Sequence, residues 1–468
     1  FESDKLYTNR YYIKNAEYSL LNVKAWNYTV SGSEVVNTKT YVSYDGGEYA
    51  EINPKEFVVA GNSTIKFKTV CVNNENVYIE SDLRKIVDVG YGDDNTVEIA
   101  RYFDGNMSAK IEDRVPVLTA SSSDAYFEFI NPLVFSQFGL GFEIPLTSDG
   151  RKQSATSVTI TLTDYFDADN KYEIEISGRN GRYAATIGGE SYSLDSDWNG
   201  AKVPIKIGGG ILLIGTRNIE AVNKFAGDLC FMSVKFDGVS SGFKVKVNEI
   251  CNQSLTTVSA TSTKVSDVAA PYVYAKLPDE VGSLGQEIII GKPYAADVLS
   301  PSSYKKLSVT VLKSGAYGDA PAKDVNGREL SGITDFESEI RLVLDDYGEY
   351  TIIYNYTDGR GNGRGTSLLY RIVTVVDIES PVLNLENEGK TVNVKVGETF
   401  KPKFTATDNF TADEDLLVYY IVKDSNENFV VVTTSDITIT KAGKYTIIVY
   451  VVDETYNGVS KSYYVNVG

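Results

Sequence analysis

The sequence predicts an all-β protein, built as a linear array of β-sandwich domains. Three observations predict it: a composition rich in tyrosine (33 residues) and poor in methionine (2 residues), runs of alternating apolar and polar residues, and an internal repeat. β-Branched and aromatic residues suit the pleated, half-buried surface of a strand. With 468 residues, the chain is long enough for about three or four domains.

Alternation is the signal for individual strands. When every second residue is apolar, one face of a strand is buried and the other meets solvent. Four runs have this pattern: 157–163, 171–177, 243–248 and 391–396. Turn sequences such as Asp45-Gly46-Gly47 and Asn180-Gly181 separate such runs, as in hairpins. Many short strands joined by such turns predict sandwiches or barrels.

An internal repeat gives the organisation of the C-terminal half. The run GEYTII at 348–353 returns as GKYTII at 443–448, 95 residues later. At the same offset lie three further pairs, Asp358 and Asp453, Asn362 and Asn457, and Gly363 and Gly458. Upstream, Asp267-x-x-x-Pro271 matches Asp377-x-x-x-Pro381 at an offset of 110, so the earlier copy has a longer loop, which we place at 317–328. A hairpin turn explains the recurring Asp and Asn-Gly.

The repeat, together with the strand-like runs before it, predicts four domains, at 1–92, 93–255, 256–376 and 377–468. We expect few contacts across their junctions, and therefore a semi-rigid rod.

The two C-terminal units resemble the bacterial immunoglobulin-like domains of large surface proteins. The resemblance rests on Tyr350 in Asp346-Tyr347-Gly348-Glu349-Tyr350 and on Tyr445, which follows Gly443 in the same way. It implies that each ring packs inside and each hydroxyl bonds nearby backbone. A fainter copy lies at 60–65, where Ser63 replaces the tyrosine, so we expect a similar sandwich at 1–92.

The segment 93–255 resembles concanavalin A-like and laminin G-like jelly rolls. The resemblance rests on its size and on the order of its strand-like runs, at 125–130, 138–144, 227–236 and 242–250. It implies a two-sheet antiparallel sandwich whose concave face or rim loops bind sugars or calcium.

Composition excludes several classes of function. With 45 Lys+Arg against 63 Asp+Glu the net charge is −18, which disfavours binding to nucleic acid. The absence of histidine removes Ser-His-Asp and Cys-His catalysis and histidine-ligated zinc. The apolar run 447–452 is far shorter than the roughly 18 residues of a membrane helix. No signal peptide opens the chain, and Phe1 suggests an internal piece of a longer protein.

Two acidic loops are candidate calcium sites. Asp164, Asp167, Asp169 and Asn170 gather oxygen ligands between two predicted strands, although turn chemistry also explains them. A second loop, near a domain junction, suggests interdomain calcium through Asp408, Asn409, Asp413, Glu414 and Asp415. We expect no required cofactor.

Trp198, flanked by Asp195 and Asp197, is the candidate sugar-binding residue. An exposed indole stacks on a sugar ring while carboxylates accept its hydroxyls, but the same tryptophan also suits a loop anchor. Cys230 and Cys251 are candidates for a disulfide whose pairing the spacing alone does not settle, and Cys71 suits a buried position.

These observations predict a non-catalytic, extracellular or cell-surface segment. We expect a monomer in which the lectin-like module binds a glycan or a host-matrix component and the immunoglobulin-like domains act as spacers. Two alternatives stay open: the accessory region of a large secreted carbohydrate-active enzyme, and a purely structural stalk.

Overall fold

The structure is a computed structural model. It describes residues 9–20, 25–29, 32–91, 95–153, 155–179, 182–194, 203–223, 225, 227–276, 278–301, 306–314, 318–336, 339–358 and 368–468. Across these residues the chain is all-β, as predicted; its helical turns there are two short 3₁₀ segments, η1 (Ile99–Tyr102) and η2 (Phe135–Gln137).

The first module comprises β1 to β10. Its main sheet has the order β1-β10-β8-β5-β6, with β9 on β8, and β2-β7 and β3-β4 are separate pairs. Its strands are β1 (Tyr11–Ile13), β2 (Glu17–Tyr18), β3 (Ala25–Thr29), β4 (Gly32–Val36), β5 (Thr38–Tyr44), β6 (Ala50–Ile52), β7 (Phe57–Val58), β8 (Thr64–Cys71), β9 (Asn74–Glu80) and β10 (Arg84–Val87).

The second module consists of two eight-stranded antiparallel sheets. One has the order β12-β15-β25-β18-β19-β20-β21 with β16 on β25, and the other β13-β14-β26-β17-β22-β23-β24 with β27 on β26. The strands are β12 (Phe103–Gly105), β13 (Met107–Glu112), β14 (Val115–Ala120), β15 (Ala125–Phe129), β16 (Leu133–Val134), β17 (Gly139–Glu143), β18 (Ser157–Asp164), β19 (Lys171–Arg179), β20 (Arg182–Ile187), β21 (Glu190–Leu194), β22 (Val203–Gly208), β23 (Ile211–Ile214), β24 (Arg217–Glu220), β25 (Leu229–Asp237), β26 (Lys244–Ile250) and β27 (Gln253–Ser254).

A small ladder closes the base of the second module. β11 (Thr96–Glu98) enters the module and β28 (Lys264–Ser266) leaves it, and the two pair antiparallel. The entry and exit of the chain therefore lie side by side.

The third and fourth modules share one topology, as the sequence repeat predicts. Each has a parallel pair at one edge of a five-stranded sheet, β30-β37-β36-β33-β34 in the third and β39-β46-β45-β42-β43 in the fourth, and each adds two antiparallel pairs. The third has β29 (Tyr272–Ala275), β30 (Val281–Gly282), β31 (Glu287–Ile290), β32 (Pro293–Ala296), β33 (Leu307–Lys313), β34 (Ala320–Pro321), β35 (Ile340–Val343), β36 (Gly348–Tyr356) and β37 (Leu368–Val375). The fourth has β38 (Val382–Leu385), β39 (Thr391–Val394), β40 (Thr399–Phe400), β41 (Phe404–Thr407), β42 (Leu417–Asp424), β43 (Phe429–Thr433), β44 (Ile437–Thr438), β45 (Gly443–Val452) and β46 (Gly458–Val467).

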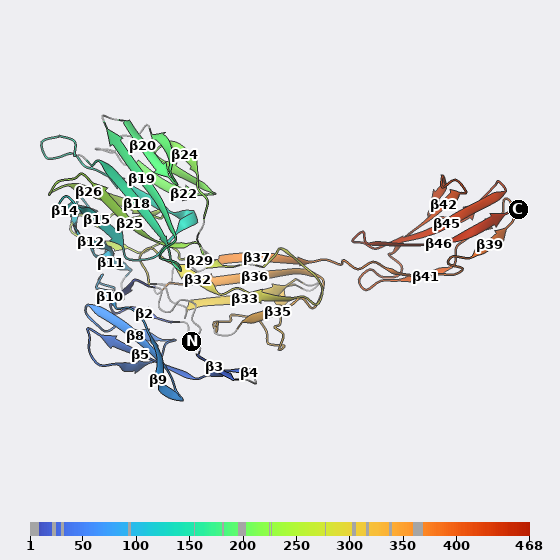
Figure 1. Ribbon diagram of the computed structural model, residues 1–468, viewed down its shortest axis with the longest axis horizontal. Coiled ribbons are helices and arrows are strands. Elements are labelled where there is room, and N and C mark those ends of the chain that lie inside the picture. Colours follow the sequence, from blue (N-terminus) through green and yellow to red (C-terminus); the bar gives the residue numbers. More distant parts are fainter. Residues whose placement is uncertain are drawn as a thin grey trace.

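The modules differ in how closely they pack. Figure 1 shows the first two modules together at one end of the long axis, the third leading away from them, and the fourth at the opposite end. Buried residues of the first and second modules form one continuous apolar cluster, which Val298 and Leu299 of the third module join. The third and fourth modules have separate cores. The expectation of few contacts between domains is therefore wrong for the earlier junctions, where large apolar side chains meet.

Candidate cation sites at two module junctions

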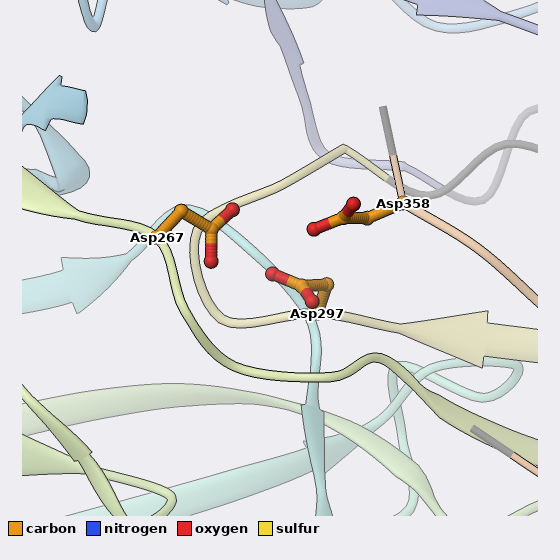
Figure 2. Close-up of side chains that lie close together, drawn as sticks. All are labelled: Asp267, Asp297 and Asp358. Carbon is orange, nitrogen blue, oxygen red and sulfur yellow. The ribbon is translucent and has the colours of Figure 1, made fainter. Parts of the chain in front are cut away.

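Three buried aspartates converge at the end of the third module that faces the second. Asp267 follows β28, Asp297 follows β32, and Asp358 lies two residues beyond β36. Figure 2 shows their carboxylates turned toward one another. One carboxylate oxygen of each lies within 4.8 Å of the others.

The fourth module repeats this arrangement. Asp377 lies between β37 and β38, Asp408 follows β41, and Asp453 follows β45. Their carboxylate oxygens again lie within 4.8 Å of one another. Since the two modules share one topology, the same strand ends bring the same three positions together. We call these clusters the first triad (Asp267, Asp297, Asp358) and the second triad (Asp377, Asp408, Asp453).

Both triads are shielded from solvent. All three members of the first triad are at most 3% exposed, and in the second Asp377 and Asp453 are buried while Asp408 is half-buried. Carboxylates without water or a counter-charge are costly to bury. Burial, followed by the neighbouring charge of Asp267, raises the pKa of Asp297 well above its ordinary range.

In each triad the aspartate of the second position, Asp297 or Asp408, has hydrogen bonds within the described part of the chain to only one of its two carboxylate oxygens. Oδ1 of Asp297 accepts hydrogen bonds from the N–H groups of Leu299 (2.9 Å) and Ser300 (2.7 Å). Oδ1 of Asp408 accepts the equivalent bonds from Phe410 (3.0 Å) and Thr411 (2.9 Å). The Oδ2 atoms of both aspartates are buried and have no hydrogen-bond partner among the described groups. One oxygen therefore fixes the loop, and the other accepts no hydrogen bond from the described groups.

Asp377 of the second triad has the same hydrogen-bonding pattern. Its Oδ1 accepts from the N–H of Glu379 at 3.0 Å, while its Oδ2 is buried with no partner among the described groups. Asp453 is instead fixed within its loop: Oδ1 accepts from the N–H groups of Thr455 and Asn457, and Oδ2 accepts from Asn457 Nδ2 at 2.9 Å. Although burial opposes it, these bonds lower the pKa of Asp453.

Such a cluster suits a hard divalent cation. Calcium takes six to eight oxygen ligands at about 2.3–2.6 Å, so oxygens on opposite sides of one ion lie up to about 5 Å apart. The 4.8 Å limit within each triad fits that span. The grouped side chains offer only oxygen, which favours calcium or magnesium over zinc or copper.

The first acidic loop predicted from the sequence is a hydrogen-bonded turn between β18 and β19. Buried Asp164 accepts from the N–H of Phe166 (2.8 Å) and from Asn170 Nδ2 (3.1 Å), and the carboxylate of Asp167 accepts from the N–H of Asp169 (3.2 Å). These contacts agree with turn chemistry, and calcium binding by this loop stays a prediction.

The second acidic loop contributes one residue to a triad. Asp408 belongs to the second triad, and Asn409 Nδ2 bonds Tyr347 Oη, whereas Asp413, Glu414 and Asp415 are exposed. Asp297 was not predicted from the sequence as a site residue. Aligning Ala295-Ala296-Asp297 with Ala406-Thr407-Asp408 would have found it.

Several predicted features lie outside the described residues: Trp198, Asp195, Asp197, Asn180-Gly181, Asn362 and Gly363. Cys71, Cys230 and Cys251 are free thiols, and Cys71 is buried as expected. Burial raises the pKa of Cys251 to about 11 and that of Cys230 well above its ordinary range. The described residues contain no helix of the length and apolarity needed to cross a membrane.

Comparisons with known proteins give likenesses at the level of module arrays. No protein-family profile matches the chain, and no curated protein matches its sequence. A tetra-tandem repeat from the extending region of a large adhesion protein is 11% identical, covering 92% of this chain and 91% of that one with a TM-score of 0.24.

Two further solved structures are similar to the same degree. The four N-terminal immunoglobulin domains of Dscam1 isoform 6.9 are 11% identical, covering 98% of this chain and 97% of that one with a TM-score of 0.23. Fibronectin(III)-like modules of Clostridium thermocellum CbhA are 15% identical, covering 42% of this chain and 93% of theirs with a TM-score of 0.19. At these TM-scores the whole molecules do not superpose.

Proposed function

We propose that this chain is a non-catalytic, extracellular array of β-sandwich modules in which calcium binds at two junctions. The observation that carries the proposal is the same three-aspartate arrangement in two modules, in each of which the Oδ2 atom of one aspartate, Asp297 or Asp408, is buried without a hydrogen-bond donor among the described groups. A bound cation would neutralise this charge and connect the end of one module to the start of the next.

The placement of the triads supports a structural role for the ion. Asp267 and Asp377 lie where the chain enters the third and fourth modules, and the other four aspartates lie in loops of those modules. An ion held by both parts ties each linker to the sandwich that follows. Extracellular fluids contain enough calcium to fill even sites of modest affinity, with dissociation constants of about 10⁻⁴–10⁻³ M.

Calorimetric titration of the full chain with CaCl₂, after removal of metal with EDTA, tests the proposal. We expect two bound ions. Asp297→Asn and Asp408→Asn should each remove one ion, since each replaces an oxygen without a donor by an amide. Glu414→Gln, in the same loop as Asp408 but exposed, should still bind two. No calcium binding, or unchanged stoichiometry in both aspartate variants, would contradict the proposal.

The second module is the part that we propose presents a ligand-binding surface. Its two eight-stranded antiparallel sheets are compatible with the lectin-like sandwich that the sequence resembles. A glycan or host-matrix component is the partner class that this resemblance implies, and we propose that the chain is a monomer at the cell surface. A glycan array probed with the full chain, with and without calcium, tests this part. Failure to bind in both conditions would leave a calcium-bound stalk, or an accessory region of a secreted carbohydrate-active enzyme.

A further inference from the structure

The two junctions that hold the triads are built differently. Between the second and third modules a buried apolar cluster crosses the junction, made of Val134, Tyr165, Leu229, Phe231 and Ala296, with Phe166, Tyr272 and Tyr294 packed against it. The two modules are therefore held together by packing that needs no ion.

Hydrogen bonds reinforce that first junction. Asn131 of the second module donates through Nδ2 to the carbonyl oxygens of Asp297 (3.3 Å), Val298 (3.1 Å) and Ser300 (3.2 Å). Tyr102, also from the second module, donates to the carbonyl of Leu299. The loop that carries Asp297 is thus fixed by the neighbouring module.

The junction between the third and fourth modules has much less packing. Their cores are separate, and the described contacts across the junction include the ring of Tyr347 against that of Phe410, with centroids 4.3 Å apart, and a hydrogen bond from Asn409 Nδ2 to Tyr347 Oη (2.5 Å). Phe410 is 44% exposed. Figure 1 shows the fourth module extending from the rest along a narrow connection.

Asp377 connects this small contact to the second triad. Its Oδ1 accepts from Tyr347 Oη of the third module (3.4 Å), and its Oδ2 is buried without a partner among the described groups. Its backbone carbonyl accepts from Thr455 Oγ1 (3.2 Å) and Asn457 Nδ2 (3.0 Å) of the fourth module. One residue therefore touches both modules and the cation site.

We infer that the second triad controls a joint between the third and fourth modules. A bound cation fixes the orientation of the fourth module relative to the third, and removal of the cation lets that orientation vary. This inference rests on the proposed calcium binding. Without the ion, three carboxylates within 4.8 Å repel one another, and the repulsion displaces Asp377 from Tyr347. The first triad loses its ion without the same consequence, because packing holds that junction.

Distributions of the distance between a spin label in the third module and one in the fourth test the inference. Nitroxides attached to p-acetylphenylalanine at Ile289 of the third module and Val432 of the fourth, both exposed positions, avoid the native cysteines. Double electron–electron resonance on the full chain should give a narrow distribution in CaCl₂ and a distribution at least twofold broader in EDTA. A second pair, Tyr126 of the second module with Ile289, should stay narrow in both conditions.

Variants separate the joint from calcium binding itself. For the Ile289–Val432 pair, Asp408→Asn should give the broad distribution even in CaCl₂, while Asp297→Asn should behave as wild type. Tyr347→Ala should still bind two ions but broaden the distribution in CaCl₂, because it removes the contact that transmits the constraint. Circular dichroism establishes that each variant is folded.

The outcomes distinguish the two proposals. If calorimetry finds two ions while the Ile289–Val432 distribution stays narrow in EDTA, the joint is wrong and calcium binding stands. The joint is equally wrong if Asp297→Asn broadens that distribution as much as Asp408→Asn does. If no ion binds, the proposed function itself fails.

Discussion

Two tyrosine hydroxyls have matching positions in the third and fourth modules. Tyr350 and Tyr445 are buried, and each hydroxyl bonds the carbonyl four residues upstream, that of Asp346 (3.2 Å) and that of Lys441 (3.1 Å). The hydroxyl of Tyr350 also lies 2.8 Å from Asp345 Oδ1. Burial and this carboxylate raise the pKa of Tyr350. The packing of each ring and the bond of each hydroxyl to nearby backbone, which the resemblance to immunoglobulin-like domains implies, are therefore confirmed in both repeats, although only one of them has the preceding aspartate.

Removing these hydroxyls should destabilise the two modules unequally. Tyr445→Phe loses one bond to backbone and should cost about 1 kcal/mol, whereas Tyr350→Phe should cost more, because it also leaves the N–H of Asp346, which donates to the hydroxyl at 3.2 Å, without its acceptor. Differential scanning calorimetry of the full chain measures both. Equal midpoints for wild type and both variants would mean that the hydroxyls contribute nothing.

Steric crowding explains why residue 291 is a glycine. A Cβ at this residue would lie 2.2 Å from the carbonyl oxygen of Lys276, and backbone cannot move aside as a side chain can. Gly291→Ala should therefore destabilise the third module by about 1–3 kcal/mol, the cost typical of overpacked cores, and lower the midpoint of the transition that contains this module. Gly208→Ala, whose new methyl group would meet nothing closer than 3.9 Å, is the matched control and should change little. A similar midpoint for both variants would show that the close approach is relieved at no cost.

At the scale of elements, a single carboxylate connects two turns of the first module. Asp45 directly follows β5, and its carboxylate accepts hydrogen bonds from the N–H groups of Asn62 (2.9 Å), Ser63 (2.7 Å) and Thr64 (2.9 Å), just before and at the start of β8. These bonds lower the pKa of Asp45. Ser63 stands at the position that Tyr350 and Tyr445 have in the other modules. Its hydroxyl donates a hydrogen bond to the same carboxylate of Asp45 (2.8 Å).

This bonding predicts a pH-dependent effect of Asp45→Asn. A carboxylate whose pKa is lower in the folded state stabilises the fold above its unfolded pKa, about 3.9, and that contribution is lost as the pH falls further. The wild type should therefore unfold at a higher temperature than Asp45→Asn at pH 6, and the difference should shrink below about pH 4. Calorimetry at pH 6 and pH 3 measures this; a difference that grows on acidification would contradict it.

Strands were easier to predict than the triads, for a physical reason. The alternating run at 157–163 is β18, and that at 391–396 begins as β39, because burial of one face repeats every two residues. A triad instead gathers residues that are tens of residues apart in the sequence, as with Asp267 and Asp358, and only the register of the sandwich brings them together. Within the sequence each aspartate has the chemistry of an ordinary turn, so Asp358 and Asp453 were interpreted as turn residues.

At the scale of the whole molecule, the first two modules form one unit. Tyr11 of the first module bonds Glu128 Oε2 of the second (2.8 Å), Lys85 pairs with Asp104 (2.6 Å), and the guanidinium of Arg10 lies 4.5 Å from the ring centroid of Phe231. Together with the continuous apolar cluster, these contacts couple the first and second modules. The apolar cluster between the second and third modules couples the third module to them. The fourth module, by contrast, shares no apolar cluster with a neighbouring module among the described residues.

This unequal coupling predicts how the chain unfolds. The fourth module should give a calorimetric transition of its own, while the first three modules unfold in one transition or in closely overlapping ones. Calcium should raise both midpoints, since an ion that binds only the folded state at about 100 times its dissociation constant adds about 2.7 kcal/mol. Asp408→Asn should abolish the calcium shift of the fourth module alone, and Asp297→Asn that of the larger transition alone. Hydrogen exchange followed by mass spectrometry assigns each transition to its strands. A single cooperative transition that contains β42 and β45 together with β18 and β25 would contradict this division. It would require strong coupling between the third and fourth modules, which the contact between Tyr347 and Phe410 is too small to provide.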